Sequence, residues 1–330
     1  MTSQTLWHPT SELLTSKSLV LLSGEGTSVP TAEAKALFLA YDPDSRFEAP
    51  ERRVLIVESK ADPSLVSSRI AFARRVGLLL ADTAEAAALL RGRRFRLRSF
   101  DLVAKNELDP ESYLRGIEGD VDLTDPECEL TLVRGAREYL ALTTPGRMDQ
   151  YWSRRRPRAR PFFHPSAIFP KLSRALVNLS RCRAGEVFLD PFVGTGSILL
   201  EAALARAHVL GLDKDARMVQ GALSNMRHFG QRWLGVIRAD AFRPPLTAVD
   251  AVATDIPYGR ASSTGGIRGS DVLQQTLSTV PSVLKRGSRL VVMHSRETTV
   301  EGNEELVLEE EHHLYIHRLL TRTITVLRRR

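Results

Sequence analysis

Four consecutive residues, Asp255-Ile256-Pro257-Tyr258, carry the groups needed to hold an amine attached to a flat ring. The apolar run 250–254 before them is typical of a buried strand. The lone pair of such an amine is delocalised into the ring, so it attacks well only when each N–H meets an acceptor. The carboxylate of Asp255 and the backbone carbonyl of Ile256 can be these acceptors. Pro257 would stiffen the turn and Tyr258 could stack on the ring.

We therefore interpret these four residues as catalytic, in an enzyme that modifies an exocyclic amine of a nucleobase. An ordinary proline turn after a strand is the simpler alternative.

A second motif, at 190–197, combines a carboxylate with two glycines between a predicted strand and a predicted helix. Gly194 and Gly196 allow the chain to turn tightly and to approach a ligand closely. No Gly-Lys-Ser/Thr follows, which excludes a Walker loop, and the third glycine of a dinucleotide fingerprint is missing. A short loop with a carboxylate better suits a cationic ligand, such as the sulfonium and amino acid end of S-adenosylmethionine.

Two further aspartates end the next two predicted strands, where ligands of a parallel sheet bind. Asp213 can accept hydrogen bonds from two ribose hydroxyls, and Asp240 can meet an adenine amine with Ala241 close by. Helix capping explains any single aspartate, but it accounts poorly for three at successive strand ends. The cofactor-binding residues predicted on this basis are Asp190, Phe192, Gly194, Gly196, Ser197, Asp213, Asp240 and Ala241.

The chain is basic and its arginines are clustered. It has 46 Lys and Arg against 39 Asp and Glu, a formal net charge of +7. Clustered guanidinium groups suit phosphate, and a basic face attracts a polyanion. A solvated charged surface is the alternative for each cluster, but several clusters beside a base-binding motif favour nucleic acid. The predicted RNA-binding residues are Arg94, Arg96 and Arg98 on one strand face, and Arg154, Arg155 and Arg156 in a second cluster.

The elements that must position these residues follow from the apolar pattern. Between 19 and 80 the order is β-α-β-α-β, typical of a split-βαβ unit. Between 83 and 143 two helices, the second at 110–117, accompany a strand and a hairpin. Residues 145–170 are rich in proline and arginine and predict a stiff connector. From 172 onward strands and helices alternate, which predicts a doubly wound parallel sheet with paired terminal strands.

Composition fits a soluble protein of two or three domains. Hydrophobic residues are 43% and charged residues 26% of 330. No apolar run approaches the ~20 residues of a membrane helix, and the N-terminus lacks a secretory signal, so we expect a cytoplasmic protein. Cys128 and Cys182 are expected to be reduced thiols; a bridge between them is the alternative. The histidines are not spaced as metal ligands, so no metal site is predicted.

These motifs resemble those of the amino-methyltransferases whose signature is Asp/Asn-Pro-Pro-Tyr. The whole chain resembles the archaeal tRNA (guanine-10-N2)-methyltransferases, and the N-terminal half does so by layout more than by motif. The stretches that carry the resemblance are 160–165, 190–201, 254–262 and 317–322. The resemblance implies an α/β protein with a C-terminal doubly wound, Rossmann-like methyltransferase sheet that ends in a β-hairpin. The implied division is 1–80 as a ferredoxin-like domain, 81–144 as a THUMP RNA-binding domain, 145–170 as a basic linker and 171–330 as the methyltransferase domain.

The resemblance also implies transfer of one or two methyl groups from S-adenosylmethionine to N2 of guanosine 10 in tRNA. It adds Phe163 and His164 to the cofactor-binding residues, because their segment closes over the cofactor in that family. Some members need a small activating protein; otherwise a monomer is implied. Position 256 is isoleucine where the family usually has proline. The backbone acceptor survives this change, and we expect a less rigid loop.

Two other functions stay open. The same tetrapeptide serves another base amine, either adenine N6 or guanine N2 at a different position. A non-catalytic tRNA-binding protein that keeps the fold is a different class. The presence of Asp190, Asp213, Asp240, Asp255 and Tyr258 argues against that class, and calorimetry of cofactor binding would distinguish the two.

Overall fold

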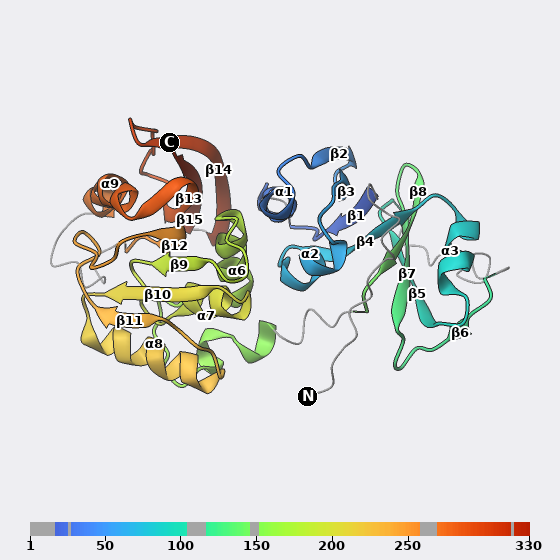
Figure 1. The fold of residues 1–330 in the computed structure, drawn as a ribbon, viewed down its shortest axis with the longest axis horizontal. Coiled ribbons are helices and arrows are strands. Elements are labelled where there is room, and N and C mark those ends of the chain that lie inside the picture. The colour runs from blue at the N-terminus through green and yellow to red at the C-terminus, as the bar shows by residue number, and fades with distance from the viewer. Residues whose placement is uncertain (1–16, 26–27, 104–116, 146–151, 258–268, 318–319) are drawn as a thin grey trace. The chain divides into compact units, whose positions relative to one another are not determined.

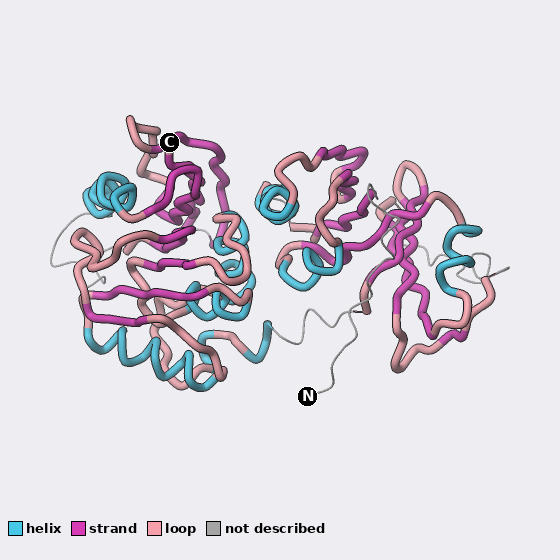
Figure 2. Tube along the Cα trace, viewed as in Figure 1, coloured by secondary structure: helices cyan, strands magenta, loops and turns pink. Residues whose placement is uncertain are grey.

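The computed structural model describes residues 17–25, 28–103, 117–145, 152–257, 269–317 and 320–330. Their contacts divide the chain into two compact units. The first holds the described residues of 1–25 and 41–148, and the second those of 26–40 and 149–330. Figure 2 shows that strands predominate in the first unit, whereas helices and strands alternate in the second. The predicted α/β class is confirmed.

The first unit is built on one eight-stranded sheet in the order β2-β3-β1-β4-β8-β7-β5-β6 (Figure 1). Its elements are β1 (Lys17–Leu22), β2 (Arg46–Glu51), β3 (Val54–Glu58), α2 (Pro63–Arg69), β4 (Ala73–Leu80), α3 (Thr83–Leu90), β5 (Arg94–Asp101), β6 (Asp120–Val121), β7 (Cys128–Arg134) and β8 (Glu138–Thr143). Asp82 caps the N-terminus of α3, because its carboxylate accepts from the Glu85 amide at 2.9 Å. The predicted helix 110–117 lies almost entirely outside the described residues.

The sheet continues across the predicted domain boundary at residue 80. Strand β4, which ends there, pairs antiparallel with β8, and Gly77 is aligned with Thr143. A Cβ at Gly77 would lie 2.2 Å from the backbone oxygen of Leu142, so only glycine permits this close approach. The predicted 1–80 and 81–144 parts therefore share one sheet. Helix α1 (Val29–Tyr41) differs too, since most of it groups with the second unit.

The second unit is a seven-stranded sheet in the order β11-β10-β9-β12-β13-β15-β14 (Figure 1). Besides α1, its elements are η1 (Pro157–Ala159), α6 (Pro170–Leu179), β9 (Val187–Asp190), α7 (Ser197–Leu204), β10 (His208–Asp213), α8 (Ala216–His228), β11 (Gly235–Arg238), β12 (Val249–Asp255), α9 (Gly269–Thr279), η2 (Val280–Ser282), β13 (Leu284–Ser295), β14 (Leu306–His317) and β15 (Leu320–Arg329). Strands β9 to β13 are parallel, and β15 is antiparallel to both β13 and β14. The predicted parallel arrangement is confirmed for β9 to β13, and the whole sheet is mixed.

Burial is nearly continuous along the central strand β12, as expected for a parallel strand that is covered on both faces. Val252 and Val292 pack in one apolar cluster with Val272 and Leu273 of α9. Helices α6 and α7 pack against each other, and α6 also contacts β12 and β13. With helices on the sheet, the polar chemistry is confined to the strand ends.

The order of the strands brings two loops together. Strand β9 has β10 on one side and β12 on the other. The strands that follow β9 in the chain are therefore added first on one side of it and then on the other, so the strand order reverses at β9. Ligands of open α/β sheets bind at such a switch point, beyond the carboxyl ends of the strands. The loops that follow β9 and β12 therefore form the candidate site. Within the described part of the chain, no helix is long and apolar enough to cross a membrane.

Candidate active site

The carboxylate of Asp255 ends β12 and is held by an arginine from β15. Arg322 Nη2 donates to Asp255 Oδ2 at 2.9 Å, and the two side chains are 6% and 16% exposed. The other oxygen, Oδ1, is buried and accepts no hydrogen bond from the described residues. Burial raises the pKa of Asp255 to about 6, although the charge of Arg322 opposes this rise. Asp255 thus has one oxygen engaged and one able to accept.

The carboxylate of Asp190 ends the neighbouring strand β9 and is fully buried. Thr254 Oγ1 of β12 donates to Asp190 Oδ1 at 2.7 Å, and the Phe192 amide donates to the same atom at 3.2 Å. Burial raises the pKa of Asp190 to about 7, against these two hydrogen bonds. Asp190 therefore joins the ends of β9 and β12 and shapes the loop that follows, in addition to any contact with a ligand.

The loop after β9 is fixed to the end of β10. The Gly194 amide donates to Asp213 Oδ2 at 3.0 Å, and the Val193 amide donates to the Leu212 carbonyl at 2.8 Å. Gly194 and Gly196 have φ angles of 49° and 78°, in the left-handed region that favours glycine. The predicted need for both glycines is therefore explained by backbone conformation. Burial raises the pKa of Asp213.

The residues that follow β11 form a partly exposed surface at the end of the sheet, which includes Asp240. Asp240 Oδ1 accepts from the Phe242 amide at 3.0 Å and lies 3.3 Å from Lys214 Nζ. The rings of Phe192 and Phe242 meet edge to face with centroids 6.0 Å apart. Two aromatic rings and a partly exposed carboxylate give this surface both apolar area and hydrogen-bond acceptors. Ala241 is buried, and Ser197 begins α7 and is also buried.

Isoleucine at position 256 gives the chain a hydrogen bond that proline cannot make. The Ile256 amide donates to the Met293 carbonyl at 2.9 Å, and the side chain is 1% exposed in the core beneath α9. A proline there would lack the N–H. This bond continues the pairing of β12 with β13 one residue beyond Asp255. Pro257 is half-buried, and Tyr258 lies outside the described residues.

The segment 160–168 is attached to the cofactor loop through residues that the sequence patterns did not single out as site residues. Asn225 of α8 is buried and accepts from the Phe162 amide at 2.9 Å. Its Nδ2 donates to the carbonyls of Phe162 at 3.0 Å and Thr195 at 2.9 Å. Arg160 is also buried and donates to Ser197 Oγ at 2.5 Å. Burial lowers the pKa of Arg160 to about 10, so it remains a cation at neutral pH.

Replacing Asn225 by leucine is expected to detach this segment from α8. Leucine is similar in size but leaves three backbone groups unpaired, each at a cost of about 1–3 kcal/mol. Amide exchange at Phe162 should become faster by about tenfold or more, measured by hydrogen exchange and mass spectrometry. Gln220→Leu on the exposed face of α8 is the matched control. Unchanged exchange at Phe162 would show that Asn225 does not hold the segment.

The contacts of Phe163 and His164 in this structure lie within their own segment. Phe163 is 42% exposed and lies under the Arg158 guanidinium, and His164 Nδ1 is 2.7 Å from Ser166 Oγ in its own turn. Phe162 lies inward instead, since a Cβ at Gly221 would lie 2.0 Å from its ring. The aromatic residue seated on α8 is thus the one before the predicted pair.

The predicted RNA-binding arginines divide into paired and exposed ones. Arg155 is 11% exposed and donates to the buried Glu201 of α7 at 2.7 Å. Arg96 is 13% exposed and pairs with the buried Glu129 at 2.7 Å. Arg94 faces three carboxylates, those of Asp122, Asp125 and Glu127. The exposed members are Arg98, Arg154 and Arg156, and of these Arg98 also lies 3.8 Å from Glu129. Arg155 and Arg96 therefore contribute ion pairs to the fold.

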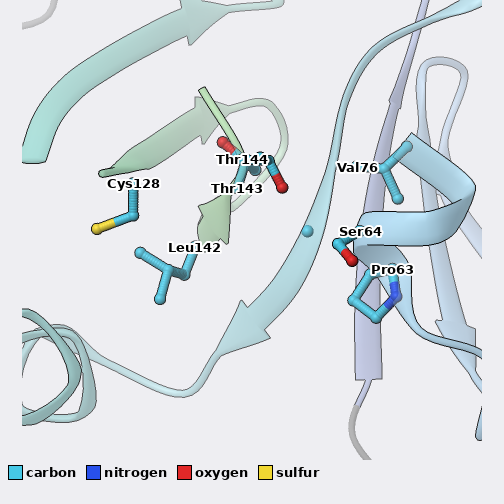
Figure 3. A pocket seen from close by; sticks show the side chains of 8 residues that line it. Pro63, Ser64, Val76, Cys128, Leu142, Thr143 and Thr144 are labelled. Atoms are coloured by element: carbon cyan, nitrogen blue, oxygen red, sulfur yellow. The ribbon is translucent and has the colours of Figure 1, made fainter. Parts of the chain in front are cut away.

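The first unit contains a small hollow, shown in Figure 3, lined by Pro63, Ser64, Val76, Gly77, Cys128, Leu142, Thr143 and Thr144. None of these is a predicted site residue. Burial raises the pKa of the Cys128 thiol to about 11, which makes it unreactive. The described residues contain no cluster of three His, Cys, Asp or Glu side chains suited to a metal ion.

Comparison with known proteins places this arrangement in a family. Residues 157–317 match the family model described as the RMKL-like methyltransferase domain. The chain is 31% identical over 332 residues to the tRNA (guanine(10)-N2)-dimethyltransferase of Methanothermobacter thermautotrophicus, and the alignment covers 94% of this chain and 99% of that relative. The chain belongs to the archaeal tRNA (guanine-10-N2)-methyltransferase family.

A further relative and a solved structure are also similar to this chain. The enzyme of the same name from Pyrococcus abyssi is 29% identical over 256 residues, 71% of this chain and 77% of the relative. Among solved structures, TrmN from Thermus thermophilus is similar with a TM-score of 0.51 and 20% identity, over 95% of this chain and 100% of that one. At this identity the likeness shows the fold alone.

Proposed function

We propose that the protein transfers methyl groups from S-adenosylmethionine to N2 of guanosine 10 in tRNA. The observation that carries the proposal is the buried Asp255 carboxylate at the switch point of the sheet, with one oxygen bound by Arg322 and the other able to accept. Membership of the family supports the choice of guanine over adenine. A non-catalytic tRNA-binding protein is not favoured, because nothing in RNA binding alone requires this carboxylate.

The loops around Asp190 fit a cofactor of this kind. Asp213 accepts the Gly194 and Asp215 amides, and its carboxylate oxygens can each accept a further bond from ribose hydroxyls. Phe192, Phe242 and Asp240 supply the apolar surface and acceptor that an adenine ring needs. When bound, S-adenosylmethionine supplies a methyl group on a positively charged sulfur. Arg160 and Asn225 hold the 160–168 segment beside this loop.

The role of Asp255 is to hold and orient the amine of guanine. An N–H that donates to Oδ1 directs the lone pair of N2 towards the methyl carbon and reduces its delocalisation into the ring. N2 would form a bond to the methyl carbon that S-adenosylmethionine supplies, and would give up one proton, which the Asp255 carboxylate beside it could accept. Most of the rate would come from this positioning. The Ile256 carbonyl is proposed as the second acceptor, and Tyr258 as the stacking residue.

Methyl transfer is expected to decline as the pH falls through the range from about 7 to about 6. Burial raises the pKa of Asp190 to about 7 and that of Asp255 to about 6. Both are carboxylates above this range and neutral below it, where Asp255 no longer offers two acceptors. The two groups interact, so the apparent midpoint belongs to both. A profile of kcat against pH measures this, and a flat acid side would contradict it.

The test of the function is to incubate the protein with labelled S-adenosylmethionine and unmodified tRNA, and to identify the modified nucleoside by mass spectrometry. The expected product is N2-methylguanosine or N2,N2-dimethylguanosine at position 10, and the ratio shows how many methyl groups are added. A tRNA with adenosine at position 10 should receive no label. Methyladenosine as the product would overturn the proposal.

The remaining assignments belong to the same proposal. We take 1–80 as a ferredoxin-like part and 81–144 as a THUMP part of the one sheet, supported by the element order β1-α1-β2-β3-α2-β4 and by the family. The exposed Arg98, Arg154 and Arg156 are the proposed phosphate contacts. The enzyme is proposed to act on tRNA in the cytoplasm, as a monomer or with a small activating protein.

A further inference from the structure

We propose that Arg322 is a positioning residue that reserves one oxygen of Asp255, so that the other oxygen receives the guanine amine. This division of the two oxygens is also why position 255 requires aspartate rather than asparagine in this chain. The inference rests on the proposed function, because it concerns how Asp255 meets its substrate.

Arg322 contacts only one of the two carboxylate oxygens of Asp255, and it is held firmly in place. Arg322 is on β15, which is separated from β12 by β13, and Met293 of β13 is aligned with Asp255 on one side and with Ile324 on the other. The guanidinium therefore reaches across β13 to place Nη2 2.9 Å from Asp255 Oδ2. Its side chain is 6% exposed, so it has little freedom to move. Oδ1 stays buried without a donor from the described residues.

A buried acceptor without a partner is costly, at about 1–3 kcal/mol. Buried carboxylates usually satisfy both oxygens, and the fold departs from this at Oδ1 of Asp255. An N–H from the base would complete the set of hydrogen bonds. Arg322 thus determines which of the two oxygens is left for the substrate.

The charges around Asp255 make Arg322 its counter-ion. The described charged or titratable groups that face this site are Arg322 on β15 and Asp190 on β9, with His294 on β13 near Arg322. His294 bonds to Thr325 and to the Ser295 carbonyl, and burial lowers its pKa, so it is neutral. Asp190 repels the charge of Asp255. Arg322 is therefore the group that favours the carboxylate form.

Asparagine cannot serve both partners. Its side chain has one acceptor oxygen and one NH₂ group, which only donates. If the oxygen accepts from Arg322, the NH₂ group faces the amine of guanine, and two donors meet. If the oxygen faces the guanine, the NH₂ group meets the guanidinium instead. Only a carboxylate presents an acceptor to each side.

The kinetic test compares Arg322→Met and Arg322→Lys in the full chain with unmodified tRNA. Arg322→Met should lower kcat by about 10- to 100-fold with little change in KM for tRNA. The acid side of its pH profile should move to higher pH by about one unit or more, because a pKa-lowering charge is lost. Arg322→Lys should restore part of both. Arg328→Met, on the same strand and paired with Glu309, is the matched control and should behave as wild type.

A second comparison tests the division of the oxygens directly. Asp255→Asn should be strongly impaired, and Asp255→Asn combined with Arg322→Met should be more active than Asp255→Asn alone, because the asparagine oxygen is then free for the guanine. A double variant no more active than Asp255→Asn would overturn the assignment of the two oxygens.

An infrared titration provides a readout without turnover. The difference spectrum between a protein and its Asp255→Asn version isolates the carboxyl band of Asp255. This band should titrate at higher pH in the Arg322→Met background than in the wild-type background. Such a shift would support the role of Arg322 whichever base amine is methylated. The role of Arg322 can therefore be tested independently of the proposed function. An unshifted titration, or an Arg322→Met enzyme with wild-type kcat, would overturn that role.

Discussion

Asp255→Ala is expected to abolish measurable methyl transfer, with kcat reduced by about 100- to 1000-fold or more. Alanine removes the acceptor that orients the guanine amine, while the loop after β9 and the exposed arginines are untouched. Affinity for tRNA should therefore change little. Single-turnover rates with labelled S-adenosylmethionine measure the chemical step, and filter binding measures the tRNA complex.

The matched control for this variant is Asp250→Asn, at the other end of β12. Asp250 pairs with Lys285 and accepts the Val187 amide, far along the strand from the glycine loop. It should remain active. Alanine at 255 also leaves Arg322 buried without its carboxylate, so folding of the variant should be checked by calorimetric binding of S-adenosylmethionine. A well-folded Asp255→Ala protein with near wild-type kcat would show that another group holds the amine.

Glu201→Ala should greatly lower the stability of the second unit. The Glu201 carboxylate is completely buried and pairs with Arg155 at 2.7 Å and with Arg174 at 2.9 Å. These arginines are only 11% and 7% exposed. Removing the carboxylate takes a shared counter-charge away from two buried cations, which costs about 3–5 kcal/mol in the free energy of unfolding.

Urea unfolding followed by tryptophan fluorescence measures this loss. Trp152 lies under the Arg155 guanidinium, 5.0 Å from it, so its fluorescence should report the release of that segment. Glu301→Gln, an exposed position in the loop after β13, should change stability by less than about 0.5 kcal/mol. A Glu201→Ala protein with equally small loss would mean that the two arginines find other partners or water.

The parts of the site that are local in sequence could be predicted from it. Asp190 and Asp255 each follow a run of apolar residues, and a strand end is recognisable from that run alone. Gly194 and Gly196 reveal a tight turn because few other residues adopt positive φ. The alternation of strands and helices predicts a parallel sheet, and in such a sheet the strand ends converge.

The residues that were missed act through contacts between distant parts of the chain. Arg322 is 67 positions from Asp255, and Asn225 is 63 positions from Phe162, so no local spacing links them. Arg155 reads as one of several exposed arginines until Glu201 is seen beside it. In the sequence Ile256 is only a departure from a motif. The structure shows that its amide donates to the Met293 carbonyl. The order of strands in the sheet determines which of these distant residues meet. The apolar pattern of a single sequence does not predict that order.

The pairing of β4 with β8 has a consequence for how the first unit folds. Residues 77–80 pair with residues 140–143, which are far away in the sequence. The two halves can therefore join only after residue 143 has been synthesised, and contacts of such long sequence separation form slowly. A fragment that ends at residue 80 would present β4 as an unpaired edge rich in leucine, a template for aggregation. The two halves should accordingly melt as one cooperative transition, and the shortest fragment that can be prepared in soluble form should extend past β8.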